Sequence, residues 1–375
     1  MTEKLRVGVI FGGQSGEHEV SLVSAQGIME AMNEERYEVI PIGITKEGRW
    51  LTSGEPMKLL QSGGPVVSAQ VAEAQPTTRG VAPRRRRDLV PGTRETGFPQ
   101  LDVVFPVLHG PYGEDGTVQG LLELADIPYV GAGVLGSALG MDKIAMKAVL
   151  ASHGLPVVEH VALKRRDWEQ DPEAMMELVE KEVGYPCFIK PANLGSSVGI
   201  SKVRQRGELA SALHLAARYD RRMLAERAVD AREIEVSVLG NDEPIASLPG
   251  EIIPCREFYD YIAKYIDDRS ELIIPADLPP AMTRRIQELA VVAFLAVDCA
   301  GMARVDFLLD KDTQELYLGE LNTIPGFTPI SMYPKLWEAS GISYSELIDR
   351  LIELALERHA DNSRSETSYS PEQFE

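Results

Sequence analysis

The stretch that decides the fold is RVDFLLDKDTQELYLGELN, Arg304–Asn322. Apolar and polar residues alternate on either side of a polar centre, which predicts a β-hairpin that turns near Asp310–Gln314. Centring the hairpin on Thr313 places Asp306 opposite Glu320 and Arg304 opposite Asn322, all on one face. The other face is expected to hold Val305, Phe307, Leu309, Tyr317 and Leu321.

The polar face of this hairpin combines two carboxylates, an amide oxygen and a guanidinium. Oxygen ligands of this kind suit Mg²⁺, which binds one or two carboxylates together with phosphate oxygens and water. Arg304 beside them suits a phosphate or a developing oxyanion. The competing interpretation is a solvated face of paired charges, which is common on hairpins.

A second segment, KPANLGSSVGI at Lys190–Ile200, follows a predicted strand and is rich in small residues. Its backbone N–H groups could cradle phosphates, with Lys190 as a compact positive charge. The lysine precedes the glycines, so this is not the G-x-x-x-x-G-K-[ST] loop, and an ordinary tight turn would also explain the composition.

Two further glycine-rich loops follow strands. FGGQSGEHEVS, Phe11–Ser21, lacks the G-x-G-x-x-G spacing of a dinucleotide fold. There Glu17 either holds an ammonium group or simply favours the helix dipole. In LHGPYGEDGTVQG, Leu108–Gly120, His109 is either a ligand contact or bonded to its own loop.

The order of the predicted elements indicates an α/β protein. Strands at Leu5–Phe11 and Tyr37–Ile44 flank a helix at about residues 20–33, a β-α-β unit typical of a parallel sheet. A long helix is expected from Met141 to His153 and a strand at Val157–Val161. Later strands and helices form an α+β pattern.

Two segments lack such periodicity. Residues 52–97 contain the basic run Arg84–Arg87, which is interpreted as part of a surface insertion rather than a nucleic-acid site. The polar residues 361–375 predict a disordered tail.

Composition limits the classes of partner. The 375 residues carry a net charge of −19, which disfavours non-specific binding to nucleic acid or to an anionic membrane. The three cysteines, Cys187, Cys255 and Cys299, are widely spaced and predict buried thiols in a reducing compartment. No secretory signal or run of about 20 apolar residues is present, so a cytoplasmic protein is expected.

Together the four quoted segments, the last extended by TIPGFTPISMYP to Pro334, resemble the D-alanine–D-alanine ligases in order and spacing. The resemblance runs from about Leu5 to Arg358. It implies the ATP-grasp fold, with an N-terminal parallel-sheet domain and ATP held between central and C-terminal α+β domains. The expected divisions are 1–140, 141–240 and 241–360.

The resemblance also implies roles for individual residues. The residues expected to contact the two D-alanine substrates or the closing loop are Glu17, His109, Ser196, Lys264, Tyr265, Ser331 and Met332. Those expected to contact ATP are Lys143, Lys190, Ser197, Glu226 and Glu233. Arg304 and the Gly326 N–H would form the oxyanion hole, and Asp306, Glu320 and Asn322 would bind two Mg²⁺ or Mn²⁺ ions.

The activity implied is ligation of two D-alanines through an acyl phosphate, with release of ADP and phosphate, for peptidoglycan precursor synthesis by a homodimer. Tyr265 favours a dipeptide over D-alanyl-D-lactate. The alternatives are a D-lactate ligase, another ATP-grasp carboxylate–amine ligase, and a non-catalytic nucleotide-binding relative.

Overall fold

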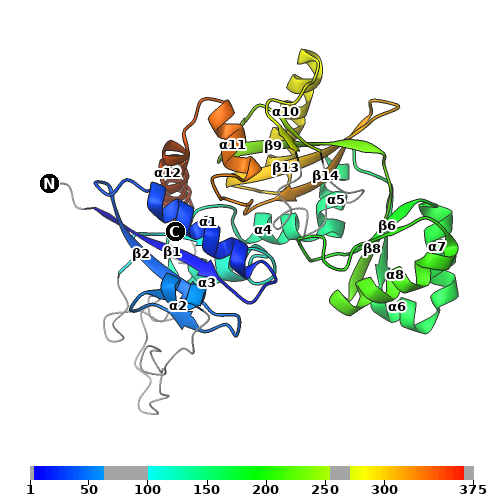
Figure 1. The fold of residues 1–375 in the computed structure, drawn as a ribbon, viewed down its shortest axis with the longest axis horizontal. Coiled ribbons are helices and arrows are strands. Elements are labelled where there is room, and N and C mark those ends of the chain that lie inside the picture. The colour runs from blue at the N-terminus through cyan, green and yellow to red at the C-terminus, as the bar shows by residue number, and fades with distance from the viewer. Residues whose placement is uncertain (1–3, 63–99, 254–270, 367–375) are drawn as a thin grey trace, which may run out of the picture.

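The first unit of the chain is a sheet of mostly parallel strands, seen in the computed structural model (Figure 1). Its order is β3 (Trp50–Leu51), β2 (Tyr37–Ile44), β1 (Leu5–Gly12) and β4 (Val103–Val107). β1 pairs in parallel with both β2 and β4, as the β-α-β pattern predicts, while β3 is antiparallel to β2. Because β1 is buried on both faces from Val7 onward, this part of it is a continuous apolar run without polar alternation.

The structure describes residues 4–62, 100–253 and 271–366. The basic run Arg84–Arg87, Cys255 and the predicted closing segment around Lys264 and Tyr265 therefore lie outside the described residues. Cys187 and Cys299 are buried free thiols, as predicted. None of the described helices is long and apolar enough to cross a membrane.

Helices cover both faces of the first sheet. The parallel crossover is α1 (His18–Ala31); α2 (Pro56–Ser62) lies in the segment predicted to be a loop, and α3 (Thr117–Ala125) follows β4. The last helix, α12 (Tyr344–Asn362), returns from the C-terminus to pack against this unit (Figure 1). It extends two residues into the predicted tail, whose last nine residues are not described. Tyr129 forms a single parallel bridge with Val104 of β4.

A single helix is present where one was predicted from Met141 to His153, and a helix that was not predicted precedes it. α4 (Val134–Met141) and α5 (Lys143–Ser152) are separated at Asp142, whose backbone is extended. The Asp142 carboxylate accepts a hydrogen bond from the Ala145 N–H at 2.9 Å and so caps α5. A capping aspartate therefore starts a new helix at the lysine that follows it.

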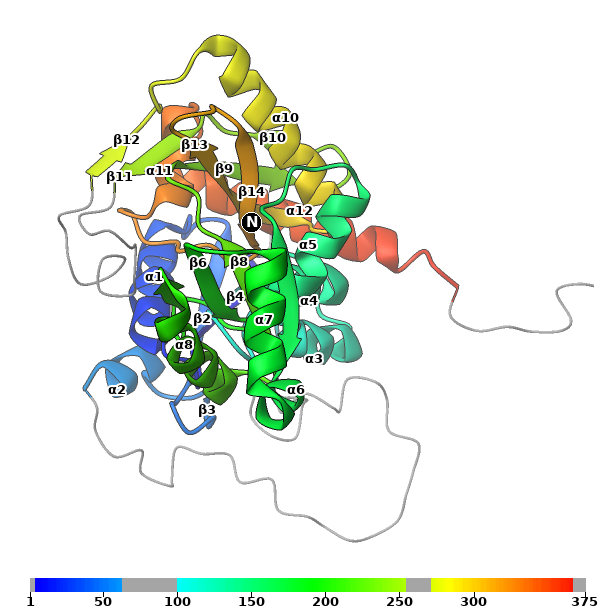
Figure 2. The same ribbon diagram turned by 90° about the vertical axis from the view of Figure 1, so that its right-hand side faces the viewer.

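The second unit is an antiparallel sheet in the order β5 (His160–Lys164), β8 (Arg222–Arg227), β6 (Cys187–Pro191) and β7 (Ser201–Val203). It packs against α6 (Arg165–Gln170), α7 (Pro172–Glu182) and α8 (Arg206–Tyr219), the green helices of Figures 1 and 2. The strand predicted at residues 157–161 begins later, at His160, and is β5. Val157 instead forms a bridge with Leu318 of another sheet.

The third unit has the order β12 (Glu271–Ile273), β11 (Gly250–Ile253), β9 (Ala231–Gly240), β13 (Gly301–Asp310) and β14 (Leu316–Asn322), with β10 (Ile245–Ala246) paired to β9. α10 (Pro280–Ala296) contacts β9 and β13, and α11 (Met332–Ala339) contacts β9. β9 thus belongs to this sheet, although it precedes the expected boundary at residue 240. The β8–β9 connection links the second and third sheets.

The predicted hairpin register is confirmed where it matters for the polar face. Asp306 is opposite Glu320 and Arg304 is opposite Asn322. Nearer the turn, the register shifts by one residue between Asp306 and Phe307, so Phe307 is opposite Leu318. The prediction for Tyr317 is wrong for this reason: Leu316 and Leu318 are buried, while Tyr317 lies on the other face.

Candidate functional site

A row of three carboxylates crosses the third sheet. Asp306 of β13 is directly opposite Glu235 of β9 and Glu320 of β14. Like charges side by side on neighbouring strands repel, so this row needs a cation. Arg304 supplies it: its Nε and Nη2 donate to the two oxygens of Asp306, both at 2.7 Å, and Nε lies 3.1 Å from Glu235.

The guanidinium is held in its charged form. Burial disfavours the charge, but Asp306 and Glu235 outweigh it and raise the pKa of Arg304. Asn322 completes the group, since its side-chain amide donates to Asp306 at 3.0 Å. The sequence predicted four of these five residues and missed Glu235, which lies on a strand far from the hairpin in the chain.

The donor atoms of this face fit Mg²⁺ or Mn²⁺. Within the described ranges, no group of three or more His, Cys, Asp or Glu side chains is arranged to hold a metal ion. Asp306 and Glu320 nevertheless face one another from paired strands, with an amide beside them. Mg²⁺ commonly binds one or two carboxylates and takes its remaining ligands from phosphates and water, so this set suits an ion that arrives with a nucleotide.

The glycine-rich loop after β6 lies against α5. The Lys143 N–H donates to the Ala192 carbonyl at 2.9 Å, and its Nζ donates to the Leu194 carbonyl at 2.8 Å. Ser196 and Ser197 both have left-handed backbones, with φ of 49° and 58°. Successive N–H groups in such a loop form a concave surface that suits phosphate oxygens.

A buried charge cluster lies beneath this loop. The Glu226 carboxylate of β8 contacts Lys190 Nζ at 2.5 Å and Lys147 Nζ of α5 at 2.6 Å. Burial alone would raise the pKa of Glu226, but the two ammonium groups prevail and lower it to about 2. The pKa of Lys190 is raised in turn, because Glu226 outweighs the effect of its burial. Lys147 was not predicted from the sequence.

The first glycine loop meets the loop after β6. Glu17, at the start of α1, is buried and makes no side-chain capping bond to its own helix. Its carboxylate instead accepts a hydrogen bond from the Ser196 hydroxyl, 179 residues away. Two of the residues expected near the substrates or the closing loop, Glu17 and Ser196, are therefore in contact with each other, while Tyr265 lies outside the described residues.

The loop after β4 contributes two buried groups. His109 Nδ1 lies 3.1 Å from the Ile324 carbonyl, so this nitrogen carries the proton. Burial lowers the pKa of His109, which leaves Nε2 an acceptor with no hydrogen-bond partner among the described residues. Glu114, which the sequence did not single out, accepts from the Gly110 N–H at 2.8 Å. Burial, reinforced by Glu17, raises the pKa of Glu114 to about 8.

Charged side chains from the three loops and from the third sheet lie close enough to interact, so these segments form one site. Glu114 interacts with Glu17 of the first loop, with Lys143 of α5 and with Glu320 of β14. Lys190 also interacts with Glu320 and Glu233. Glu226 and Glu233 lie at the two ends of the β8–β9 connection, which places them at the hinge between the second and third sheets.

Gly326, Ser331 and Met332 lie in the segment before α11. A Cβ on Gly326 would stand 3.2 Å from Ser331 Oγ, so these two residues are neighbours. Ser331 Oγ also accepts from the Thr328 N–H at 3.1 Å. The Met332 side chain packs with Ile252 and Leu336 in a small core, so only its backbone could meet a substrate.

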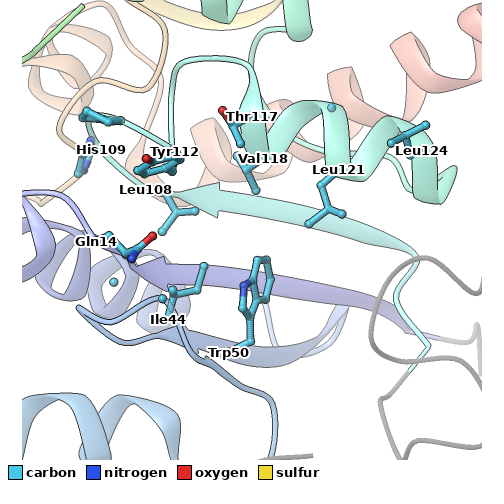
Figure 3. Close-up of a pocket in the computed structure, with 16 residues that line it drawn as sticks. Gln14, Ile44, Trp50, Leu108, His109, Tyr112, Thr117, Val118, Leu121 and Leu124 are labelled. Carbon is cyan, nitrogen blue, oxygen red and sulfur yellow. The ribbon is translucent and has the colours of Figure 1, made fainter. Parts of the chain in front are cut away.

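A cavity of about 660 Å³ opens at the carboxyl ends of β1, β2 and β4 (Figure 3). Its labelled walls include His109, Trp50 and Leu121. The lining holds neither Glu17 nor a lysine and is mostly apolar, so it does not suit a triphosphate.

Comparison with known proteins agrees with this arrangement. Residues 6–132 match the family model described as D-ala D-ala ligase N-terminus, and residues 149–353 match D-ala D-ala ligase C-terminus. The D-alanine--D-alanine ligase of Natranaerobius thermophilus is 50% identical over 98% of this chain and 99% of its own. That of Thermoanaerobacter sp. strain X514 is 53% identical over 96% and 99%.

Solved structures show the same fold. The D-alanine-D-alanine ligase from Coxiella burnetii matches with a TM-score of 0.80 and 38% identity, over 97% of both chains. The VanG D-Ala:D-Ser ligase from Enterococcus faecalis matches with a TM-score of 0.81 and 38% identity, over 94% of this chain and 100% of its own. The predicted ATP-grasp architecture is confirmed, and the chain belongs to the D-alanine–D-alanine ligase family.

Proposed function

We propose that the chain joins two D-alanine molecules to D-alanyl-D-alanine at the expense of ATP, for peptidoglycan precursor synthesis. The observation that carries this proposal is the meeting of the Glu17 loop with the glycine-rich loop through the Ser196 hydroxyl. A carboxylate suited to an amino group thereby lies beside a loop suited to phosphates. This adjacency is what activation of an amino acid by ATP requires.

The first D-alanine would lie between Glu17 and His109. Its carboxylate attacks the γ-phosphorus of ATP, the bond to the β-phosphate oxygen breaks, and an acyl phosphate and ADP result. Glu17 would accept hydrogen bonds from the substrate ammonium. His109 could pair with the substrate carboxylate only after taking up a proton on Nε2, which is otherwise an acceptor.

The nucleotide would lie between the second and third sheets. Lys143, Lys190 and the loop at Ser197 would contact the phosphates, while Glu226 and Glu233 would contact the adenosine from the hinge. Lysine ammonium groups neutralise phosphate charge as it moves during transfer. The buried cluster around Glu226 keeps Lys190 protonated, which suits that role.

The second D-alanine would bind near Ser331 and the backbone of Met332. Its amine attacks the acyl carbon and loses a proton, and phosphate leaves. Arg304 and the Gly326 N–H would stabilise the tetrahedral oxyanion. Closure by Lys264 and Tyr265 would exclude water from the acyl phosphate.

Asp306, Glu320 and Asn322 would hold two Mg²⁺ or Mn²⁺ ions, which supply Lewis-acid stabilisation of the transferred phosphoryl group when bound. Arg304 would keep Glu235, 3.1 Å away, as a counter-charge while Asp306 holds the metal ions. We also propose three domains, with the first boundary near residue 140 and the second moved from residue 240 to the β8–β9 connection, together with a homodimer and a cytoplasmic location.

Phosphate release from ATP and Mg²⁺ tests the function, with D-alanine, L-alanine or no amino acid added. We expect release only with D-alanine, and one dipeptide per phosphate by mass spectrometry. D-Serine and D-lactate belong in the same assay as second substrates, because one matched structure is a D-Ala:D-Ser ligase. A preference for either over D-alanine would reassign the product, and release without any D-alanine dependence would overturn the proposal.

A further inference from the structure

One buried cation in the molecule has no role in the function proposed above. Lys147 lies in the middle of α5 and is 1% exposed. An ammonium group removed from water is costly by several kcal/mol unless a counter-charge compensates it. The counter-charge is Glu226, itself 2% exposed, whose Oε2 lies 2.6 Å from Lys147 Nζ.

Glu226 is shared between two lysines. Its other oxygen, Oε1, accepts from Lys190 Nζ at 2.5 Å. Lys190 is the last-but-one residue of β6, directly before the glycine-rich loop, and its side chain remains 21% exposed. One carboxylate thus links a fully enclosed ammonium on α5 to a partly open one at the edge of the site.

The same helix also holds the loop itself. Lys143, one turn before Lys147, donates from Nζ to the Leu194 carbonyl. Residues four apart lie on one face of a helix, so α5 presents both lysines to the second sheet. Lys143 contacts the loop directly, whereas Lys147 reaches only the carboxylate beneath it.

We propose that Lys147 is a positioning residue for nucleotide binding, which acts through Glu226 on the ammonium of Lys190. With Lys147 in place, two ammonium groups share one carboxylate and the cluster keeps a net positive charge. Without it, Glu226 and Lys190 form a neutral pair. Lys190 is then drawn to the carboxylate and attracts an anionic nucleotide less strongly.

The inference rests on the proposed function, so its test measures nucleotide binding directly. The probe is ADP with Mg²⁺, titrated calorimetrically into wild type, Lys147→Met and Lys181→Met. Methionine keeps the length of the side chain and removes the charge. Lys181 is the matched control, because its side chain is 79% exposed and its ammonium pairs with Glu182 on the same helix, α7.

We expect the ADP dissociation constant to rise ~10-fold or more for Lys147→Met and to stay unchanged for Lys181→Met. In turnover, KM for ATP should rise in parallel while kcat falls less than ~3-fold and KM for D-alanine is unchanged. A merely structural role would lower the thermal midpoint and leave the affinity of the folded protein unaltered. That result would overturn the inference.

A double-mutant cycle with Lys190→Met identifies the route of the effect. If Lys147 acts through Lys190, the double variant should bind ADP about as weakly as Lys190→Met alone, and independent additive losses would contradict the inference. Should Lys147→Met lack a cooperative unfolding transition, Lys147→Gln takes its place with the same expected outcomes. Failure of the wild type to bind ADP would instead refute the proposed function.

Discussion

Replacing Ser196 by alanine should open the contact between the first loop and the glycine-rich loop. The Ser196 hydroxyl donates to Glu17, which is 8% exposed. A hydrogen bond to a charged group contributes about 1.5–3 kcal/mol, so its loss should disfavour the closed arrangement by about 2 kcal/mol. That corresponds to a roughly 30-fold smaller population of closed loops.

The backbone of the same residue opposes closure and offers a matched variant. Ser196 has φ of 49°, a left-handed conformation that costs a non-glycine residue about 1–2 kcal/mol. Ser196→Gly removes the same hydroxyl but relieves this strain. The loss of activity for Ser196→Gly should therefore be smaller, no more than about 5-fold rather than 30-fold.

Steady-state phosphate release with D-alanine as the varied substrate measures these effects as kcat/KM. Hydrogen exchange of the amides between Asn193 and Ile200 measures the opening itself. Ser211→Ala serves as a control, since that exposed hydroxyl donates to the Glu208 carbonyl within its own helix, α8. A change below about twofold in kcat/KM for Ser196→Ala, or equal losses for alanine and glycine, would refute the reasoning.

Four other changes have expected outcomes. Arg304→Met should lower kcat by about 10²–10³-fold in the coupled phosphate assay, because it removes a charged donor at the proposed oxyanion position; an unchanged kcat would assign Arg304 a structural role. Glu320→Gln should raise the Mg²⁺ concentration for half-maximal activity about 10-fold or more and weaken Mn²⁺ binding seen by electron paramagnetic resonance, and chelation with EDTA should abolish wild-type turnover. Phe327→Leu should lower the free energy of unfolding by about 2 kcal/mol in urea, since the ring is buried between Phe105 and Tyr344 at centroid distances of 5.9 and 5.5 Å. The pKa of Glu226 falls from 4.5 to about 2 on folding, which contributes on the order of 3 kcal/mol to the free energy of unfolding. This contribution is fully present above pH 4.5 and is lost as the pH falls towards 2. The difference in thermal midpoint between wild type and Glu226→Gln should therefore be constant from pH 8 to pH 5 and shrink only below that.

The sequence predicts this fold well where the pattern is local. The hairpin at residues 304–322 could be placed in register because the polar turn fixes its centre and side chains alternate on each strand. The bulge next to Asp306 could not be foreseen. Gly319 is the residue that the register skips, and a Cβ there would stand 3.2 Å from the Asp306 carbonyl oxygen. Tyr317 was therefore assigned to the wrong face.

The parts of the site that sequence reasoning missed depend on contacts between distant segments. Lys147 lies in an ordinary amphipathic helix, and nothing in the local sequence marks it. The fold brings Glu226, 79 positions later, to within ion-pair distance of it. Glu235 meets Arg304 only because β9 pairs with β13. Glu114 lies in the loop Leu108–Gly120, from which the sequence analysis selected His109 alone. What sets Glu114 apart from other acidic residues is its burial near Glu17, which the sequence does not show.

The acidic composition of the chain explains why the cations proposed to meet the phosphates are paired with carboxylates. With 57 acidic against 38 basic residues, the protein as a whole repels a nucleotide. Attraction must therefore be local, and each buried cation must also remain charged in a low-dielectric site. Glu226 and Asp306 keep Lys190 and Arg304 protonated, as the raised pKa values of both cations indicate. A carboxylate that paired with one cation alone would cancel its charge. At Glu226 the second lysine, Lys147, adds a positive charge that the carboxylate cannot cancel. At Asp306 a bound metal ion would offset the charge of the carboxylate, so that Arg304 would keep more of its own. Both arrangements leave a positive charge to meet the phosphates.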